Sequence, residues 1–430
     1  MKRNNLFFVI CIYRILVDIL YNFGLKFSTS RVDFVFSFSI ESYLISWLAF
    51  LLICGIYIFL FLDENRLSYN FSQQFFVLLF LLSVIPVTVM FGGGGISVEC
   101  FRGYFLLIIW LLILQSIVYG LLQHEILDEE IKRNKWKKSV FAFIGIVFLL
   151  VIVVTFFYFN GGNFYSGGLN VYKQRFLWKQ MVSAMPIVLT YMLMMANVIE
   201  MMLLLFCLRQ KKYIVAFVVL VIWYMHFSLG GDKIVLLSLM ITVITYYFAK
   251  SLSIERIFYG GCCVVCLCIF ELCLYQFKFL NTDLGTTLLR RILFVPAGLQ
   301  DCWFDFFTKH DSNLWGINTD YTIGYGLENI ISDVYLNEPL GHADTGLLGD
   351  CFGNLGLYGI ILYPVVLVVI LMLFDYVVRR KDCRIFLGVS LLFVMNIMDS
   401  MLTTAMVSHG GFLMIIMLWL FPAQNDTEGA

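Results

Sequence analysis

The sequence is poor in charged residues. Only 13% of its 430 residues are Asp, Glu, Lys or Arg, whereas soluble domains average about 25%. The 29 basic and 29 acidic side chains also balance, so no excess of positive charge points to nucleic acid as a partner. With 61% hydrophobic residues and a mean hydropathy of +0.89, the composition excludes a soluble globule and is typical of a polytopic membrane protein.

A cleavage site for a signal peptidase is also missing. The apolar run after Asn5 contains no small-residue motif of that kind, so we expect the first spanning helix to stay in place and to direct insertion itself. The 12 cysteines lie mostly inside apolar runs, as Cys262 and Cys268 do, where a thiol behaves as a small hydrophobe. We therefore expect neither a metal site nor a cofactor.

Apolar runs close to the roughly 20 residues of a membrane-spanning helix occur about 12 times. They cover residues 6–23, 40–62, 74–91, 103–122, 139–159, 182–208, 213–229, 233–249, 257–279, 346–374, 385–401 and 410–422. This pattern predicts an all-α polytopic membrane protein whose residues 1–430 form a single integral membrane domain. Residues 281–345 form one large polar loop between the ninth and tenth predicted spans.

The placement of Lys and Arg gives an orientation. Seventeen of them lie in the segments on the side of the N-terminus, against ten on the other side. Because cytoplasmic segments carry the excess of basic residues, we expect both termini in the cytoplasm and the large loop outside. No duplication of one half of the chain in the other is visible, which argues against a transporter built from repeats.

The large loop contains an arginine pair, Arg290 and Arg291, between apolar residues. A short interfacial helix could hold both at headgroup depth, where guanidinium groups bind phosphate in bidentate fashion; contact with lipid headgroups or a nearby acid is the alternative. Aromatic rings such as Trp303 and Tyr325 could stack on sugars or belong to an interfacial aromatic belt.

The end of the loop leads directly into an apolar helix through His342, Asp344 and Thr345. Asp344 or Thr345 is a natural N-cap, and the helix N-terminus would attract anions. Capping does not account for His342, which could act as a base or a phosphate partner. Asp350 lies inside the apolar run, where an acid is costly enough to indicate a role or an ion pair.

Three further sites carry charge near or inside the spans. Lys233 follows Asp232 in a very short outer turn, so its cation could contact phosphate or extend to the membrane surface. Arg175 lies in another outer loop with two lysines. Arg14 and Asp18 are four residues apart within the first span, and we expect them to neutralise each other.

The late outer loop with an Arg followed by Pro296, the re-entry at residues 344–356 and the Gly-Gly-Asp-Lys turn at 230–233 together resemble the bacterial O-antigen polymerase (Wzy) family. The resemblance implies a GT-C-like glycosyltransferase architecture in the inner membrane. It also implies polymerisation of undecaprenyl-diphosphate-linked oligosaccharide repeats on the periplasmic face, with a chain-length regulator protein as a possible partner. On this hypothesis His342, Asp344, Arg290 and Arg291 are catalytic, and Lys233, Arg175, Asp232, Trp303 and Tyr325 bind the diphosphate or the sugars.

Two other functions share parts of this pattern. An O-antigen ligase has a similar architecture and the same leaving group, but it transfers finished polymer to lipid A core. A flippase for lipid-linked oligosaccharides also has about 12 spans, although it does not need the large outer loop and would carry charged residues along a central cavity. A purely structural membrane protein leaves the clustered outer polar residues unexplained.

Overall fold

The computed structural model describes residues 2–24, 37–61, 70–122, 135–164, 171–231, 233–248, 254–318, 326–338, 341–379 and 381–422. These ranges contain helices and no strand. The helices are α1 (Lys2–Ile19), η1 (Leu20–Gly24), α2 (Ile40–Phe61), α3 (Phe71–Leu79), η3 (Phe80–Val84), α4 (Ile85–Gly92), α5 (Val98–Leu122), α6 (Lys135–Phe159), α7 (Val171–Ala184), α8 (Ile187–Arg209), α9 (Tyr213–Gly230), α10 (Lys233–Phe248), α11 (Ile254–Gln276), α12 (Leu284–Leu293), α13 (Val295–Lys309), η5 (Leu314–Gly316), α14 (Leu327–Leu336), α15 (Gly346–Leu355), α16 (Leu357–Val378), α17 (Cys383–Asp399), α18 (Leu402–Met406) and α19 (Gly411–Leu420).

Ten helical segments within the described ranges are long and apolar enough to cross a membrane, which confirms an all-helical, membrane-embedded protein. Two of the 12 predicted spans correspond to shorter helices: α10 has 16 residues and α17 has 17. The predicted span over residues 346–374 is in fact two helices, because Gly356 adopts φ 58° and ψ −139° between α15 and α16. Only α16 is long enough to cross.

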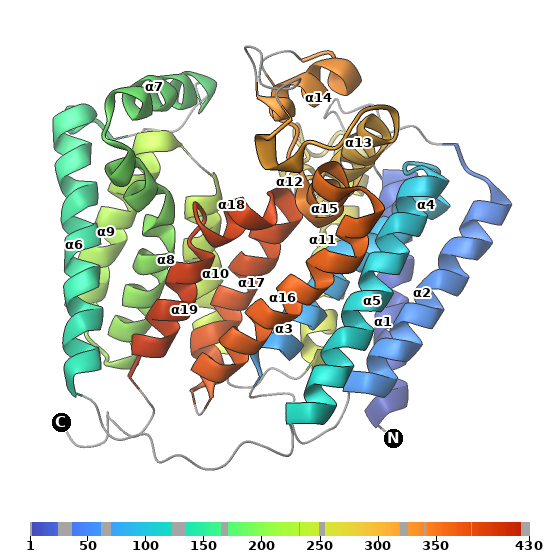
Figure 1. Ribbon diagram of the computed structural model, residues 1–430, viewed down its shortest axis with the longest axis horizontal. Coiled ribbons are helices and arrows are strands. Elements are labelled where there is room, and N and C mark those ends of the chain that lie inside the picture. Colours follow the sequence, from blue (N-terminus) through green and yellow to red (C-terminus); the bar gives the residue numbers. More distant parts are fainter. Residues whose placement is uncertain are drawn as a thin grey trace.

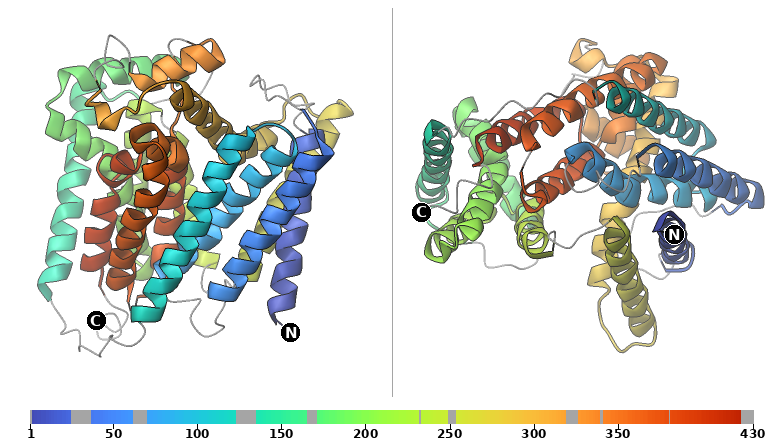
Figure 2. Two further views of the ribbon diagram at one scale, coloured as in Figure 1. Left: turned by 45° about the vertical axis from the view of Figure 1, so that its right-hand side comes forward. Right: turned by 90° about the horizontal axis from the view of Figure 1, so that it is seen from below.

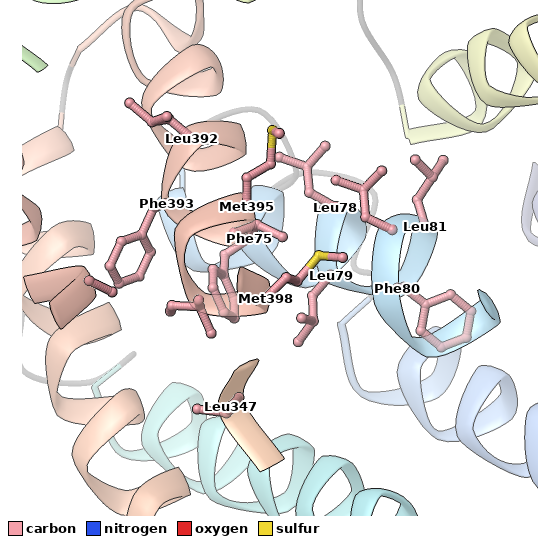
Figure 3. Packing of buried hydrophobic residues seen from close by; sticks show 14 of the residues in the cluster. Phe75, Leu78, Leu79, Phe80, Leu81, Leu347, Leu392, Phe393, Met395 and Met398 are labelled. Atoms are coloured by element: carbon pink, nitrogen blue, oxygen red, sulfur yellow. The ribbon is translucent and has the colours of Figure 1, made fainter. Parts of the chain in front are cut away.

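The helices form two groups joined by a central layer (Figure 1). One group contains α6, α8, α9, α10 and α19, and the other contains α1, α2, α4, α5 and α11; α3, α16 and α17 lie between them. The continuous run α3–η3–α4 is the innermost helix, with 94% of residues 71–92 buried. Figure 3 shows how its apolar side chains, such as Phe75 and Leu79, face Phe393 and Met398 of α17.

Buried polar contacts fix particular helices in this apolar interior. Asp375 of α16 accepts hydrogen bonds from the backbone N–H and the hydroxyl of Ser72 at 2.9 and 2.5 Å, and so satisfies the open amide at the start of α3. Arg14 and Asp18 of α1 form the expected ion pair at 2.5 Å. The same guanidinium also donates to Ser46 of α2 at 3.0 Å, so the pair joins the two helices.

Helices α7, α12, α13 and α14 lie at one end of the bundle, and α1 begins at the opposite end (Figures 1 and 2). The sequence presented residues 281–345 as a polar loop; the described part of it contains three α-helices. They form because α12 and α13 each bury an apolar face, including Leu293 and Phe304, against α11 and α15. This folded segment, together with α7, is called the cap below.

The end opposite the cap is rich in basic side chains. Arg209 donates to the carbonyl oxygen of Pro422 at 3.0 Å, and Lys381 donates to that of Phe421 at 2.8 Å. Lys137 lies 4.0 Å from the centroid of the Trp419 ring. The starts of α6 and α17 and the ends of α8 and α19 therefore meet at this end.

Candidate active site

The arginine pair lies on α12, at the end nearest α13. The carboxylate of Glu271 accepts the backbone N–H groups of Gly285 and Thr286 at 3.0 and 2.8 Å, which satisfies the open donors of the first turn. The two arginines stand in the last turn, where the helix dipole favours cations. The sequence therefore encodes a stable short helix whose C-terminal end is positive.

The two arginines differ in environment. Arg290 is buried, with 8% of its surface exposed, whereas Arg291 is exposed. Burial, and then the charge of Arg291, lower the pKa of Arg290, and Asp283 opposes this shift. A guanidinium remains protonated under such shifts. Arg291 is consequently the cation of the pair that a solute reaches first, and Arg290 supports it from inside.

The segment that carries His342 and Asp344 is held by the cap through its backbone. Trp303 of α13 donates from Nε1 to the carbonyl oxygen of Ala343 at 3.1 Å, and Asn329 of α14 donates to that of Gly341 at 2.6 Å. The backbone amide of Ala343 donates to the backbone carbonyl oxygen of Glu328 at 3.2 Å. The carbonyl groups are thereby satisfied from two helices, and His342 is left exposed between them.

The position of Trp303 corrects its predicted role. Only 1% of its surface is exposed, and its ring stacks on Phe307 at 5.9 Å. It cannot offer a face to a sugar in this structure. Its indole N–H instead positions the segment that bears His342 and Asp344, because a buried indole donor needs a partner.

The start of α15 is set by an unusually close approach of three elements. Gly346 has φ +66°, and a Cβ added there would lie 2.6 Å from Cδ of Gln300 and 2.7 Å from the carbonyl oxygen of Met398. Gln300 also accepts the backbone N–H of Leu348 at 3.1 Å. Thr345 is the N-cap residue but makes no capping hydrogen bond with its side chain. The segment before α15 is therefore pressed directly against the end of α17.

This contact brings an acid from α17 to the site. Asp399 is the last residue of α17, and its charge interacts with those of Asp344 and Arg291. The residue as a whole is exposed, but its carboxyl group is largely surrounded by protein. Burial of that group and then the neighbouring Asp344 carboxylate raise the pKa of Asp399 to about 7, and Arg291 acts in the opposite direction. Asp399 therefore lies within electrostatic range of a second carboxyl group and of one guanidinium, which stand on two other elements.

A second acid of this region has a structural role. Asp350 of α15 is fully buried and accepts hydrogen bonds from the amide of Leu402 and from Asn354, both at 2.7 Å. Burial raises the pKa of Asp350 to about 6. The sequence singled out Asp350 as an acid in an apolar run, and its contacts show that it ties α15 to the start of α18.

The structure places Arg291 and Asp344 within electrostatic range of Asp399. Arg290 precedes Arg291 on α12, and His342 stands two residues before Asp344. Arg175 belongs to α7 and Lys233 begins α10, but the side chains of both lie outside the described part of the structure. Asp232 and Tyr325 lie outside the described residues altogether. Helix α7 is tied to the end of α9 through Gln174, which donates to the carbonyl oxygens of Ser228 and Leu229 at 2.7 and 3.0 Å.

Asp399 is not among the residues that the sequence singled out. It is one of several polar residues at the end of a predicted span, between Asn396 and Ser400. An ionisable residue at such a position is itself a signal of function. Its partners, however, lie 55 and 108 residues earlier in the chain, so only the fold reveals that they meet.

The arrangement supplies the groups for one kind of chemistry. A carboxyl group that titrates near neutrality can take a proton from a hydroxyl group, and an exposed guanidinium beside it can stabilise negative charge on a departing phosphate. Comparison of the chain with models of protein families, with curated protein sequences and with solved structures found no match. The function must therefore be argued from these residues.

Proposed function

We propose that the protein is a membrane glycosyltransferase that polymerises undecaprenyl-diphosphate-linked oligosaccharide repeats at the cap end of the bundle. The observation that carries the proposal is that Asp399, at the end of α17, lies within electrostatic range of Arg291 and Asp344 of the cap. The acceptor hydroxyl of one lipid-linked repeat attacks the anomeric carbon of the growing chain. The bond between that carbon and the diphosphate oxygen breaks, and the undecaprenyl diphosphate leaves.

The positive charge suits the leaving group. Cleavage of the sugar–diphosphate bond increases negative charge on the departing oxygen, and a preorganised cation stabilises that charge more in the transition state than in the ground state. Arg291 is exposed and lies in the last turn of α12. Arg290 beside it adds a second, buried positive charge that the same diphosphate would experience.

The carboxyl groups of Asp399 and Asp344 are suited to activate the acceptor hydroxyl group. A general base works best when its pKa lies near the working pH, and Asp399 meets this condition with a pKa of about 7. We assign to Asp399 the removal of the proton from the acceptor hydroxyl, with Asp344 raising its basicity through like-charge repulsion. The exposed His342 is the remaining candidate for this role.

The distribution of charge supports a sidedness for the reaction. The basic end of the bundle, with Arg209, Lys381 and Lys137, lies opposite the cap. Because basic residues concentrate on the cytoplasmic side, the proposal places that end and both termini in the cytoplasm. The cap then faces the periplasm, where both lipid-linked substrates of the proposed reaction would be presented.

The proposal is tested in a host that makes the matching lipid-linked repeat and lacks this protein. Complementation with Arg291→Ala or Asp399→Asn should lower the rate of polymer formation by roughly 10²-fold or more, as expected for a lost transition-state contact. Lys309→Ala is the matched control, because Lys309 is an exposed cation of the cap that pairs with Asp305 at 2.6 Å, away from the cluster; it should retain normal chain lengths.

The same experiment separates the alternatives. Loss of a polymerase leaves single repeats, loss of a ligase leaves long polymer on the lipid carrier, and loss of a flippase leaves repeats on the cytoplasmic side. Full-length polymer on the carrier in the strain that lacks the protein would assign it to ligation. Normal chain lengths with both site variants, at unchanged amounts of protein in the membrane, would overturn the assignment of the site.

A further inference from the structure

A groove on the membrane-facing side of the bundle lies between α2 and the α4–α5 pair. Its volume is about 470 Å³, within the range of ligand clefts, roughly 300–1,000 Å³. The stacked rings of Phe91 and Phe101, with centroids 3.9 Å apart, form a rigid aromatic wall. Along α2, Ile45, Leu48 and Leu52 line it and are at least half exposed.

The groove has the length of one membrane leaflet. On α2 its lining runs from Glu41 to Leu52, which at 1.5 Å per helical residue is about 16 Å. Half of a hydrocarbon core is about 15 Å. A hydrocarbon chain lying in the groove would therefore extend from the membrane surface to about the bilayer centre.

Two opposite charges stand at the cap end of this groove. Glu41 is in the first turn of α2 and Arg102 is in the second turn of α5; both are exposed and line the groove. Neither forms an ion pair with any other described residue of the chain. Ser97, just before α5, donates to Asp301 of α13 at 3.1 and 2.5 Å, which places this end at the level of the cap.

The charges decide the kind of lipid. A polyprenyl diphosphate or an anionic phospholipid would satisfy Arg102 but would meet the negative charge of Glu41. A zwitterionic headgroup places its phosphate at Arg102 and its ammonium at Glu41, and a primary ammonium offers three N–H donors to the carboxylate. We propose that the groove is a specific site for an ethanolamine glycerophospholipid, distinct from the reaction site on α12 and α17.

The site is tested on the purified full-length protein by native mass spectrometry, with ethanolamine, glycerol and choline phospholipids and a polyprenyl phosphate as competing probes. One ethanolamine lipid should remain bound to the wild-type protein at energies that remove the others. Arg102→Gln should weaken its retention about tenfold or more, the size of a lost charge-assisted hydrogen bond. Glu41→Gln should abolish the preference for ethanolamine over glycerol headgroups.

A pair of apolar variants provides the matched control. Leu48→Trp fills the groove and should release the lipid, whereas Leu44→Trp changes an equally exposed residue of α2 that does not line it and should not. Equal retention of glycerol and ethanolamine lipids by the wild-type protein would overturn the proposal. Stronger retention of the polyprenyl phosphate, or equal release by both tryptophan variants, would also overturn it.

Discussion

At the scale of single residues, environment separates side chains of the same type. Asp350 and Asp399 are both acids near the cap, yet Asp350 is buried and fully engaged by Leu402 and Asn354. Asp399 retains an exposed residue surface and lies within electrostatic range of Asp344 and Arg291. The first acid therefore supports the fold, whereas the second is available to a substrate.

The pH dependence of the reaction should report Asp399. Because its raised pKa is about 7, its basic form appears as pH rises through that value, and we expect the initial rate of polymer formation in proteoliposomes to fall about tenfold for each pH unit below it. Asp344→Asn removes a negative neighbour, lowers the pKa of Asp399 and should move this acidic limb of the pH–rate profile to lower pH. Arg291→Gln removes a positive neighbour and raises the pKa of Asp399. The acidic limb in the pH–rate profile of this variant's residual activity should therefore move to higher pH.

The opposite directions of the two shifts are the control for a general loss of structure. A distorted site would lower the rate at every pH without moving the limb in both directions. If the limb stays in place in both variants, Asp399 is not the group that titrates, and the exposed His342 becomes the candidate for the base.

At the scale of elements, the site depends on where helices begin and end. Helix α15 starts against the end of α17 and against α13, with Gly346 at the point of contact. Helix α12 carries its arginines in its last turn, and Glu271 satisfies the backbone amides of its first turn. The end residues of these helices, rather than their apolar faces, therefore carry the proposed chemistry.

The junction at Gly346 should tolerate no side chain. Gly346→Ala places a Cβ at 2.6 Å from Gln300 in a backbone conformation with φ +66°, and we expect a loss of roughly 2–4 kcal/mol from strain and overpacking. Thermal unfolding of the purified protein in detergent measures this loss of stability. Gly55→Ala in α2, where no atom lies within 4 Å of the added Cβ, is the control and should be neutral or slightly stabilising. Equal melting temperatures for the two variants would show that the contact at Gly346 is not tight.

At the scale of the whole molecule, the basic side chains of Arg209, Lys381 and Lys137 lie at one end of the helix bundle and the cap lies at the other. Two pairs of ionisable groups lie inside the spans: Arg14 with Asp18 in α1, and Glu200 of α8 with His226 of α9 at 2.9 Å. Such pairing is expected, because an unpaired charge in hydrocarbon is costly. The outer surface of the bundle consequently exposes large hydrophobic side chains, while the exposed charged side chains gather at its two ends.

The orientation of the molecule can be measured with reporters. A periplasmic reporter inserted after Asn337, an exposed residue at the end of α14, should be active. The same reporter fused after Pro422 should be inactive, since it follows the basic end. The reverse result would place the cap in the cytoplasm and would exclude a periplasmic polymerase.

The sequence by itself determined the class of the protein, because the positions and lengths of the apolar runs follow directly from the thickness of the membrane. It also identified the Arg14–Asp18 pair and the arginine pair, since residues close in the chain are close in a helix. It could not show that the loop over residues 281–345 folds into helices, that Trp303 is buried, or that Asp399 meets Asp344 and Arg291. Those facts depend on contacts between distant segments, and only the tertiary packing of α13, α15 and α17 decided them.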